Sequence, residues 1–374
     1  MKVILFDDST WDNLLPLTHT KPVSHVRIGA FKVIEKWERR MELPCIVQCK
    51  DYLLKKFGQE YSGEAIYVNS SVLPDEELVR KIKSLENNQG YRCGEKIVAY
   101  KGHFSEIEFT DLEGFSQLNH LWDIFLLNSQ EINRDTELVD RKYKVGKWEG
   151  NFILGKGMIY AGENVAAQGV SFNTSEGPII IGKNVTIMEG SLLRGPLAIG
   201  DGAVIKMGAK IYGGTTIGPK CTVGGEIKNS VFTAYSNKGH DGYIGNSVIG
   251  EWCNLGADTN CSNMKNTLGE IKVWSIGKNK MVNSHQIFCG VFMGDYVRTG
   301  ISSRLNTGVV IDVACNVIQN DPVRKYLPAF SWGEMNNADL EKVQLSNVRL
   351  AELKKEVYSS DDQAILQHLY ATLS

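Results

Sequence analysis

The sequence predicts a chain of three parts: a mixed α/β domain, a long parallel β-helix and a short helical tail. Aliphatic residues recur at every sixth position through the middle of the chain, and most of the 37 glycines fall between residues 146 and 308. Neither feature extends into the first 125 residues. At 374 residues the chain is long enough for two or three domains. We therefore expect segments 1–140, 141–334 and 335–374 as its units.

Composition excludes several classes of function. The net charge is −2, so no large basic surface is expected and nucleic acid is not an expected partner. The eight cysteines form no CxxC pair, which is typical of reduced thiols in a cytoplasmic protein. The apolar run at the N-terminus is too short for a signal peptide. No stretch reaches the roughly 18 apolar residues of a membrane span, so no membrane association is expected.

The first part reads as α/β because short apolar runs are followed by segments with helical spacing. Val3–Phe6 and Ala65–Val68 are expected as buried strands. Ala30–Met41 has the spacing of a helix. Asp75–Leu85 is expected as a second helix, because Pro74 precedes it and its charges gather on one side.

The middle part carries a repeat of six. Aliphatics fill about a quarter to a third of an average chain, so eight consecutive hits at one spacing are not expected by chance. The same phase returns later, from Met293 to Val317. The eight positions are Ile181, Ile187, Leu193, Ile199, Ile205, Ile211, Ile217 and Val223.

A period of six fits neither an α-helix nor a hairpin of strands. It fits a triangular coil, in which each face is one short strand and three hexads complete one turn. The aliphatic residue then points inward and stacks on its counterpart in the next coil. Glycine often follows the aliphatic residue, as at Gly182, Gly200 and Gly218, and supplies backbone angles that corners need.

The repeat breaks between Val223 and Ile249. A solenoid is expected to accommodate an insertion as a loop that leaves a corner. Loops on rigid scaffolds often carry functional residues. This segment holds Lys228, His240 and Tyr243 within sixteen residues, so it is the first candidate for a site.

The hexapeptide repeat resembles that of left-handed β-helix acyltransferases and of sugar nucleotidyltransferases that carry such a tail. This resemblance implies a left-handed coil and a homotrimer with active sites between neighbouring prisms. The broken segment is similar to the acetyltransferase half of the bifunctional GlmU family, whose motif reads roughly K-(11 residues)-H-x-x-Y-(L/V)-G-D-(3 residues)-G-x-x-x-N-(I/L)-G-A-G-T. The matching positions are Lys228, His240, Tyr243, Asn254, Ala257 and Asn263.

The resemblance implies N-acetylation of a hexosamine 1-phosphate by acetyl-CoA. His240 would be the general base that takes a proton from the sugar amine, since the unperturbed pKa of histidine lies near neutral pH. The backbone N–H of Ala257 would contact the acetyl-CoA and stabilise the oxyanion.

Four further residues would bind the sugar by the same resemblance. Lys228 and Tyr243 would contact the phosphate, where an ammonium and a hydroxyl suit a dianion. Asn254 would contact the acetamido group, and Asn263 would lie close to the reacting amine.

The match has departures. Asp258 stands where the family has glycine, and Met264 stands where it has tyrosine. The family's arginine one coil before the lysine has two candidate counterparts, Lys206 and Lys210.

The segment from Asn13 to Gly29 contains Leu-Pro-Leu-Thr and resembles the opening of sugar-1-phosphate nucleotidyltransferases. Residues 121–125 and 327–333 agree with a divergent GlmU-like family in which such a domain precedes the β-helix. The family's Gly-rich loop is replaced by Asp7–Asp12, and its catalytic lysine position holds Val23. Asn69–Ser71 stands where a metal-binding aspartate is expected.

The resemblance implies formation of a UDP- or dTDP-sugar from a sugar 1-phosphate and a nucleotide. Lys21 and Arg27 would bind phosphates, and Asp7 and Asp8 would hold Mg²⁺. A domain that is inactive and kept for packing is an equal alternative.

The tail from Asn336 to Leu373 has helical spacing, with Ser360–Asp361 as the expected cap between two helices. Its expected role is packing on the β-helix or on a neighbouring subunit.

Three hypotheses follow. The first is an enzyme of amino-sugar nucleotide synthesis that transfers acetyl groups and nucleotidyl groups. The second is a nucleotidyltransferase whose β-helix is purely structural. The third is a non-catalytic scaffold that binds sugar nucleotides.

Overall fold

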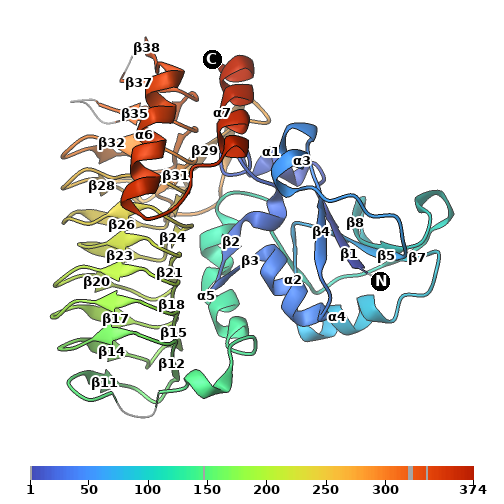
Figure 1. The fold of residues 1–374 in the computed structure, drawn as a ribbon, viewed down its shortest axis with the longest axis horizontal. Coiled ribbons are helices and arrows are strands. Elements are labelled where there is room, and N and C mark those ends of the chain that lie inside the picture. Colours follow the sequence, from blue (N-terminus) through green and yellow to red (C-terminus); the bar gives the residue numbers. More distant parts are fainter. Residues whose placement is uncertain (1, 146–147, 319–322, 334–335) are drawn as a thin grey trace.

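A computed structural model describes residues 2–145, 148–318, 323–333 and 336–374. The N-terminal domain lies along one side of a long β-helix, and two C-terminal helices pack near the far end of that helix (Figure 1). None of the helices in the described residues is both long and apolar enough to cross a membrane.

The N-terminal domain is built on a six-stranded mixed sheet in the order β4-β1-β5-β8-β7-β9. Strand β1 pairs in parallel with both β4 and β5, and β5 pairs antiparallel with β8. The carboxyl ends of the three parallel strands therefore meet at one edge, where α/β folds commonly bind ligands. The strands are β1 (Lys2–Phe6), β4 (Cys45–Gln48), β5 (Ala65–Asn69), β7 (Gln89–Cys93), β8 (Lys96–Lys101) and β9 (Glu108–Asp111).

The expected strands and helices of this domain are confirmed, with one shifted boundary. The helix expected from Ala30 begins only at Val33, because residues Arg27–Ile28 and Phe31–Lys32 pair as a short hairpin, β2 and β3. The other pair of short strands is β6 (Val72–Leu73) and β10 (Ser116–Gln117). The helices are α1 (Thr10–Asn13), α2 (Val33–Met41), α3 (Asp51–Phe57), α4 (Glu76–Lys83) and α5 (Asp123–Asp135).

The parallel β-helix is confirmed, and its strands stack into three faces. The domain face packs against α5 of the N-terminal domain. It consists of β12 (Ile159–Ala161), β15 (Ile179–Ile181), β18 (Leu197–Ile199), β21 (Thr215–Ile217), β24 (Val231–Phe232), β27 (Val248–Ile249), β31 (Val291–Met293), β34 (Val309–Ile311) and β36 (Tyr326–Leu327).

The outer face and the tail face complete the prism. The outer face consists of β11 (Phe152–Leu154), β14 (Ser171–Asn173), β17 (Leu192–Arg194), β20 (Lys210–Ile211), β23 (Glu226–Lys228) and β26 (Tyr243–Gly245), continued by β28 (Asn260–Cys261) and β33 (Arg304–Leu305). The tail face consists of β13 (Ala166–Ala167), β16 (Thr186–Ile187), β19 (Val204–Ile205), β22 (Thr222–Val223) and β25 (Asn237–Lys238), then β32 (Arg298–Thr299), β35 (Asn316–Val317), β37 (Ser331–Trp332) and β38 (Asn336–Asn337).

The inward residues are those that the period of six predicts. Ile181, Ile199 and Ile217 stack in register on the domain face, and each is at most 3% exposed. One core cluster runs from Ile159 to Leu327 through all three faces. The coil is stable only as a stack, because each coil covers the apolar side of the next.

The expectation of a protruding loop between Val223 and Ile249 is wrong. This segment stays within the β-helix as strands β23 to β27, and its coils are shortened instead. Val223 pairs with Lys238, which makes that coil 15 residues long where the coil before it, from Ile205 to Val223, has 18. Removing corner residues shifts the sequence period while leaving the stack of strands continuous.

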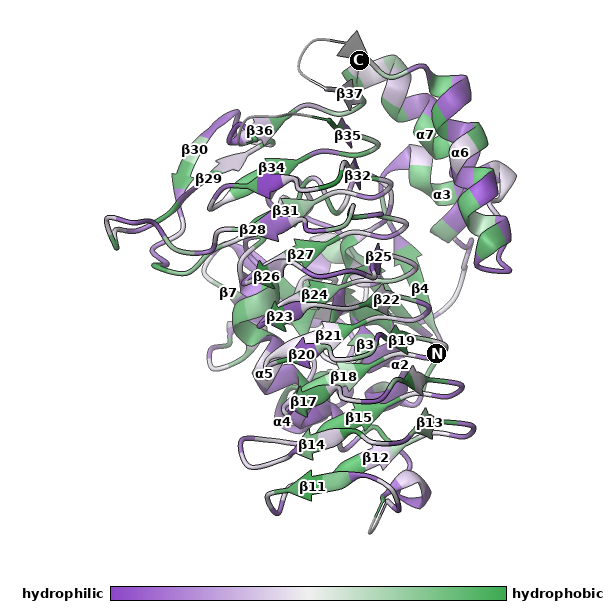
Figure 2. Cartoon of the chain, turned by 90° about the vertical axis from the view of Figure 1, so that its left-hand side faces the viewer, coloured by the Kyte–Doolittle hydropathy of each residue, from purple (hydrophilic) through white to green (hydrophobic). Residues whose placement is uncertain are grey.

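The insertion that leaves the coil occurs later, between Met264 and Phe288, which are joined by an isolated antiparallel bridge. It carries the hairpin of β29 (Lys272–Ser275) and β30 (Lys280–Asn283), which projects from the coils in Figure 2. Trp274 of this hairpin stacks on Tyr326, with ring centroids 5.5 Å apart. The hairpin side chains also join the core cluster of the N-terminal domain, so the insertion ties the two units together.

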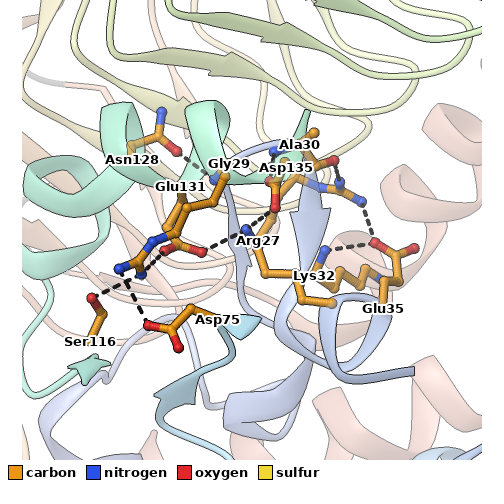
Figure 3. A network of polar contacts seen from close by, with 12 residues as sticks. Arg27, Gly29, Ala30, Lys32, Glu35, Asp75, Ser116, Asn128, Glu131 and Asp135 are labelled. Carbon is orange, nitrogen blue, oxygen red and sulfur yellow. Dashed lines mark hydrogen bonds and ion pairs between the residues drawn. The ribbon is translucent and has the colours of Figure 1, made fainter. Parts of the chain in front are cut away.

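A buried polar network fixes α5 between the hairpin β2–β3 and the β-helix (Figure 3). Lys36 Nζ lies 2.8 Å from Glu131 Oε2 and 2.5 Å from Asp135 Oδ1, and all three side chains are 1% exposed. Asn128 accepts a hydrogen bond from the backbone N–H of Gly29 and donates to a carbonyl of the domain face. The N-terminal domain is therefore joined to the β-helix by paired polar groups as well as by apolar contact.

The tail consists of α6 (Leu340–Leu353) and α7 (Ser360–Leu373). The cap of α7 is Ser359, one residue before the expected pair, and its hydroxyl accepts from the N–H of Asp362. Lys354, at the end of α6, donates to the Asn237 side chain on the tail face at 2.7 Å. The expected packing of the tail on the β-helix is confirmed.

Candidate functional site

His240 lies exposed at the corner between the tail face and the outer face, in the turn that connects β25 to β26. The corner of the next coil stacks directly on it, since the N–H of Asp258 donates to the carbonyl of Asp241 at 3.1 Å. Ala257 therefore lies one coil beyond His240 at the same corner. The structure brings these two predicted residues together.

A second group of predicted residues lies on the outer face beside this corner. Lys228 of β23 pairs with Gly245 of β26, and Tyr243 lies on the same strand as Gly245. The hydroxyl of Tyr243 accepts from Asn263 Nδ2 at 3.0 Å, and the same amide donates to Asn246 Oδ1 at 2.8 Å. Tyr243 and Asn263 are therefore held together by a direct hydrogen bond.

Glycine 245 makes room for this arrangement. A Cβ at Gly245 would lie 2.2 Å from the Tyr243 hydroxyl oxygen and 2.8 Å from Asn263 Nδ2. The phenol ring thus lies across a residue without a side chain. Burial raises the pKa of Tyr243 to about 12, so its hydroxyl is a neutral donor at physiological pH.

Asn254 lies on a different face from Tyr243 and Asn263. It forms an isolated bridge between Asn237 and Arg298 on the tail face, and its Oδ1 is 3.4 Å from Asn237 Nδ2. Asn237 in turn accepts from Lys354 of the tail. The structure therefore does not bring Asn254 into the outer-face group within one chain.

Asp258, the main departure from the family motif, has a left-handed backbone with φ 58°. Its carboxylate accepts from Asn260 Nδ2 at 2.9 Å and from Ser302 Oγ at 3.2 Å. These bonds hold the carboxylate at the corner beside Ala257, on an exposed surface.

Sequence reasoning missed Lys238, which precedes His240 by two residues. It occupies an inward position where neighbouring coils carry Val223, and it is 1% exposed. Its ammonium donates to the carbonyl of His240 at 2.7 Å. In the sequence, Lys238 would stand out only as a lysine at a position where the repeat has an aliphatic residue. The shortened coil shifts the repeat, so that position is not recognised.

A second candidate site lies at the carboxyl ends of the parallel strands of the N-terminal domain. A cavity of about 660 Å³ is lined there by Asp7 and Asp8 after β1 and by Lys50 after β4. Asn69, at the end of β5, donates to Asp8 Oδ2 at 2.9 Å. All three parallel strands thus contribute polar side chains to one region, as the α/β arrangement predicts.

The two carboxylates have opposite electrostatic environments. Burial is the main cause that raises the pKa of Asp7 to about 7, although Ser70 and the backbone of Val23 act against it. Burial also opposes ionisation of Asp8, but hydrogen bonds from Thr10 and Asn69 outweigh it and hold the pKa of that carboxyl below its usual range. Such divergence between neighbouring carboxyls is common at functional sites.

Lys50 lines this cavity, and Lys96 lies beside Asp8. Lys50 Nζ lies 4.7 Å from the centroid of the Trp11 ring. Lys96 donates to Thr10, Ser71 and Asn119 at 3.0 to 3.1 Å, and its Nζ is 4.0 Å from Asp8 Oδ2. Neither lysine was predicted from the sequence. Lys50 follows β4 and Lys96 begins β8, and the sequence does not show which strands lie beside these two in the sheet.

Lys21 and Arg27 lie at the interface between the domain and the β-helix and are each 5% exposed. Lys21 Nζ is 2.6 Å from Asp295 Oδ2 and 3.4 Å from Glu251 Oε1. Arg27 donates through Nε to the carbonyl of Thr233 at 2.9 Å. Neither is among the residues that line the cavity of Asp7 and Asp8, and phosphate binding by them stays a prediction.

Magnesium fits the N-terminal site chemically. Two carboxylates in one cavity suit Mg²⁺, which proteins commonly hold through one or two carboxylates together with substrate phosphates. The described residues contain no group of three or more His, Cys, Asp or Glu side chains arranged for a metal. The phosphates of a substrate would have to supply the remaining ligands.

Comparisons with known proteins find one family model and several relatives. Residues 3–144 match the model of a family described as sugar nucleotidyl transferase. The bifunctional sugar-1-phosphate nucleotidylyltransferase/acetyltransferase of Sulfurisphaera tokodaii is 30% identical over 231 residues, which are 59% of this chain and 54% of the relative. The bifunctional protein GlmU of Methanocaldococcus jannaschii is 38% identical over 90 residues, which are 24% of this chain and 21% of the relative. The matches therefore span about half of the first relative and a fifth of the second.

Two solved structures are similar over parts of the chain. The polySia-specific acetyltransferase NeuO covers 56% of this chain with 11% identity and a TM-score of 0.30. An Arabidopsis UDP-N-acetylglucosamine acyltransferase covers 59% with 15% identity and a TM-score of 0.25.

Proposed function

We propose that this chain, a relative of the GlmU-type bifunctional proteins with a sugar nucleotidyl transferase domain at its N-terminus, N-acetylates a hexosamine 1-phosphate with acetyl-CoA. The observation that carries this proposal is the cluster of His240, Ala257, Tyr243, Asn263 and Lys228 at one corner of the β-helix and the adjoining outer face. The similarity to bifunctional relatives supports it.

The chemistry follows from the residues at this corner. The sugar amine attacks the thioester carbonyl while His240 takes the proton that the nitrogen loses. A C–N bond forms, the C–S bond breaks, and the coenzyme leaves as a thiol after accepting a proton. The backbone N–H of Ala257, one coil from His240, is suited to the oxyanion of the intermediate.

Lys228 and Tyr243 are suited to the phosphate end of the sugar. The lysine is exposed and brings a positive charge, and the tyrosine brings a hydroxyl that is neutral at physiological pH. Asn263 donates to Tyr243 and to Asn246, so it holds the tyrosine in place. Lys228 and Tyr243 present donors to a dianion on one face.

We also propose that the protein is a homotrimer in which a neighbouring prism covers the outer face. Large apolar side chains are exposed there, including Phe152 at 59%, Leu192 at 52% and Leu154 at 43%. The lowest strand of this face, β11, is hydrophobic in Figure 2. Size-exclusion chromatography with light scattering should give three times the 41.6 kDa mass, and Leu192→Glu should give monomers.

The N-terminal cavity supports nucleotidyl transfer as a second activity. Asp7 and Asp8 would hold Mg²⁺, which would neutralise phosphate charge when bound. Lys50 lines the same cavity and would bind a phosphate. The expected product is a UDP- or dTDP-sugar, and pyrophosphate release from UTP or dTTP with a sugar 1-phosphate would measure it. Asp7→Asn should abolish release and leave thiol release from acetyl-CoA unchanged.

The test of the acetyl transfer is His240→Ala in the full-length protein. Its thiol release from acetyl-CoA with a hexosamine 1-phosphate should fall by at least about a hundredfold, within the range of general base catalysis. His103→Ala is a matched control on the N-terminal domain, and its turnover should equal that of the wild type. Unchanged turnover in His240→Ala would overturn the assignment. Pyrophosphate release that persists without any acetyl transfer would favour a nucleotidyltransferase with a structural β-helix.

A further inference from the structure

The corner that carries His240 departs from the regular hydrogen-bond ladder of the β-helix. At an ordinary corner, the carbonyl of the residue two positions after the inward residue accepts a hydrogen bond from a backbone N–H of the next coil. After the inward residue Ile187, for example, the carbonyl of Glu189 accepts from the N–H of Gly208 at 3.1 Å. One coil beyond His240, Ala257 accepts from the N–H of Ser302 at 2.7 Å in the same way.

His240 occupies the equivalent position but lacks the equivalent bond. The N–H of Asp258 reaches the carbonyl of Asp241 instead, one residue further along. The left-handed residue of this corner is Gly242, with φ 115°, and not the residue before it. The ladder has slipped by one residue at the His240 corner.

Lys238 supplies the missing donor from inside the prism. Its Nζ lies 2.7 Å from the carbonyl oxygen of His240, 3.1 Å from that of Asp241 and 3.3 Å from that of Gly224. Three carbonyls thus receive the three N–H bonds that an ammonium can donate. The side chain is 1% exposed, so these bonds form away from water.

The preceding coil leaves space for this ammonium. Its corner between β22 and β23 is reduced to Gly224 and Gly225, where the corners after β16, β19 and β25 have four residues. A Cβ at Gly225 would lie 2.9 Å from Lys238 Nζ. The short coil and the buried lysine are therefore two parts of one arrangement.

We infer that Lys238 is a positioning residue for acetyl transfer, which holds the backbone of His240 so that the imidazole meets the sugar amine. This inference rests on the proposed function. Lys238 touches no substrate, because it lies beneath the corner. Its effect on the reaction passes through the His240 carbonyl.

The charge of Lys238 is costly to the fold. Burial is the main cause that lowers its pKa to about 8, with Asp241 and Asp258 acting in the opposite direction. A lysine whose folded pKa is below its unfolded value destabilises the fold while it is charged, and the cost is relieved as pH rises from about 8 toward 10.5. A purely structural position would carry an aliphatic residue, as Val223 does in the coil before.

The test is Lys238→Met, which keeps the length of the side chain and removes the ammonium. We expect a kcat for acetyl transfer at least about tenfold lower, since a misplacement of 1 Å can cost up to about a hundredfold. The KM values for acetyl-CoA and sugar should change less than about threefold, and the Tm should fall, because three carbonyls lose their donor. Amide exchange of residues 239–243 should accelerate. Lys183→Met, which removes an exposed charge from an earlier coil, should change none of these.

The inference fails if Lys238→Met keeps wild-type kcat while His240→Ala is inactive, or if exchange at residues 239–243 is unchanged. An active His240→Ala variant would refute the proposed function but not the exchange result, so the two failures are distinguishable. If Lys238→Met does not fold, the wild type provides the test. Protection of residues 239–243, corrected for intrinsic exchange, should fall as pH passes about 8, and unchanged protection up to pH 9.5 would overturn the inference.

Discussion

Replacing Lys21 by Met should destabilise the contact between the N-terminal domain and the β-helix more than a substitution on the surface does. The ammonium of Lys21 lies between the carboxylates of Asp295 and Glu251, and its side chain is 6% exposed. Removing it leaves two buried carboxylates without their shared cation. Breaking a buried ion pair from one side typically costs about 3–5 kcal/mol.

The pKa of Glu251 is lowered by the same interaction. Burial alone would raise this pKa, but Lys21 and, to a lesser extent, Lys32, Lys56 and Arg27 outweigh it and lower the pKa from 4.5 to about 2. Burial raises the pKa of Asp295, the other carboxyl beside Lys21, so the two carboxyls shift in opposite directions. From the cost of breaking a buried ion pair, we expect Lys21→Met to lose about 3 kcal/mol of the free energy of unfolding at pH 7.

The pH dependence has a definite sign. Because the folded pKa of Glu251 lies below its unfolded value, its stabilisation is present above about pH 4.5 and is lost as pH falls toward 2. As pH falls toward 2, the wild type should lose more stability than the Lys21→Met variant, because the variant has already lost the interaction. The raised pKa of Asp295 acts in the opposite direction and reduces the loss in the wild type.

Urea unfolding at pH 7 is the assay, with Lys56→Met as the matched control. Lys56 also joins the N-terminal domain to the rest of the chain, through Asp362 of α7 at 2.5 Å, but its side chain is 33% exposed. Exposed pairs contribute about 1 kcal/mol or less. The reasoning is refuted if Lys21→Met is within 1 kcal/mol of the wild type. Loss of pyrophosphate release by a stable Lys21→Met protein would instead support phosphate binding by Lys21.

Three further predictions concern other parts of the chain. Lys36→Met should lose about 3–5 kcal/mol in urea unfolding, because it leaves the buried carboxylates of Glu131 and Asp135 unpaired, and a loss below 1 kcal/mol would contradict the network in Figure 3. Gly218→Ala should lose about 2–3 kcal/mol of the free energy of unfolding, because its Cβ would lie 1.9 Å from the Thr233 carbonyl oxygen. In the control Gly300→Ala the nearest atom is 3.5 Å away, so its loss should stay within about 1 kcal/mol. Equal losses in the two variants would contradict the close stacking of the coils. Asp258→Gly should lower the KM for acetyl-CoA about fivefold, since it removes a charge worth about 1 kcal/mol of repulsion near the surface; a raised KM would show that the carboxylate helps binding.

The period of six predicted the β-helix core from the sequence alone. The inward residues from Ile181 to Val223 all point into the prism, because stacking of identical coils leaves no other register. The protruding loop expected at residues 223–249 was wrong for a related reason. A break in a period has the same appearance whether residues are added or removed, and here the coils are shortened.

The polar contacts of the interface lay beyond sequence reasoning. Lys21 and Asp295 are 274 residues apart, and nothing local in the sequence relates them. The same holds for Lys238, whose inward direction depends on the two-residue corner at Gly224 and Gly225. The segment that carries the His240 corner could be proposed from the sequence, because its motif is local and continuous from Lys228 to Asn263, and its role stays a prediction.

The most direct measurement is thiol release from acetyl-CoA by the wild-type protein with a panel of hexosamine 1-phosphates. The account predicts that at least one amino sugar 1-phosphate supports multiple turnovers. The matching hexose 1-phosphate, which lacks the amine, should support none. Mass spectrometry should detect one added acetyl group on the sugar. Equal thiol release with and without the amino group, or none with any amino sugar, would contradict acetyl transfer at the His240 corner.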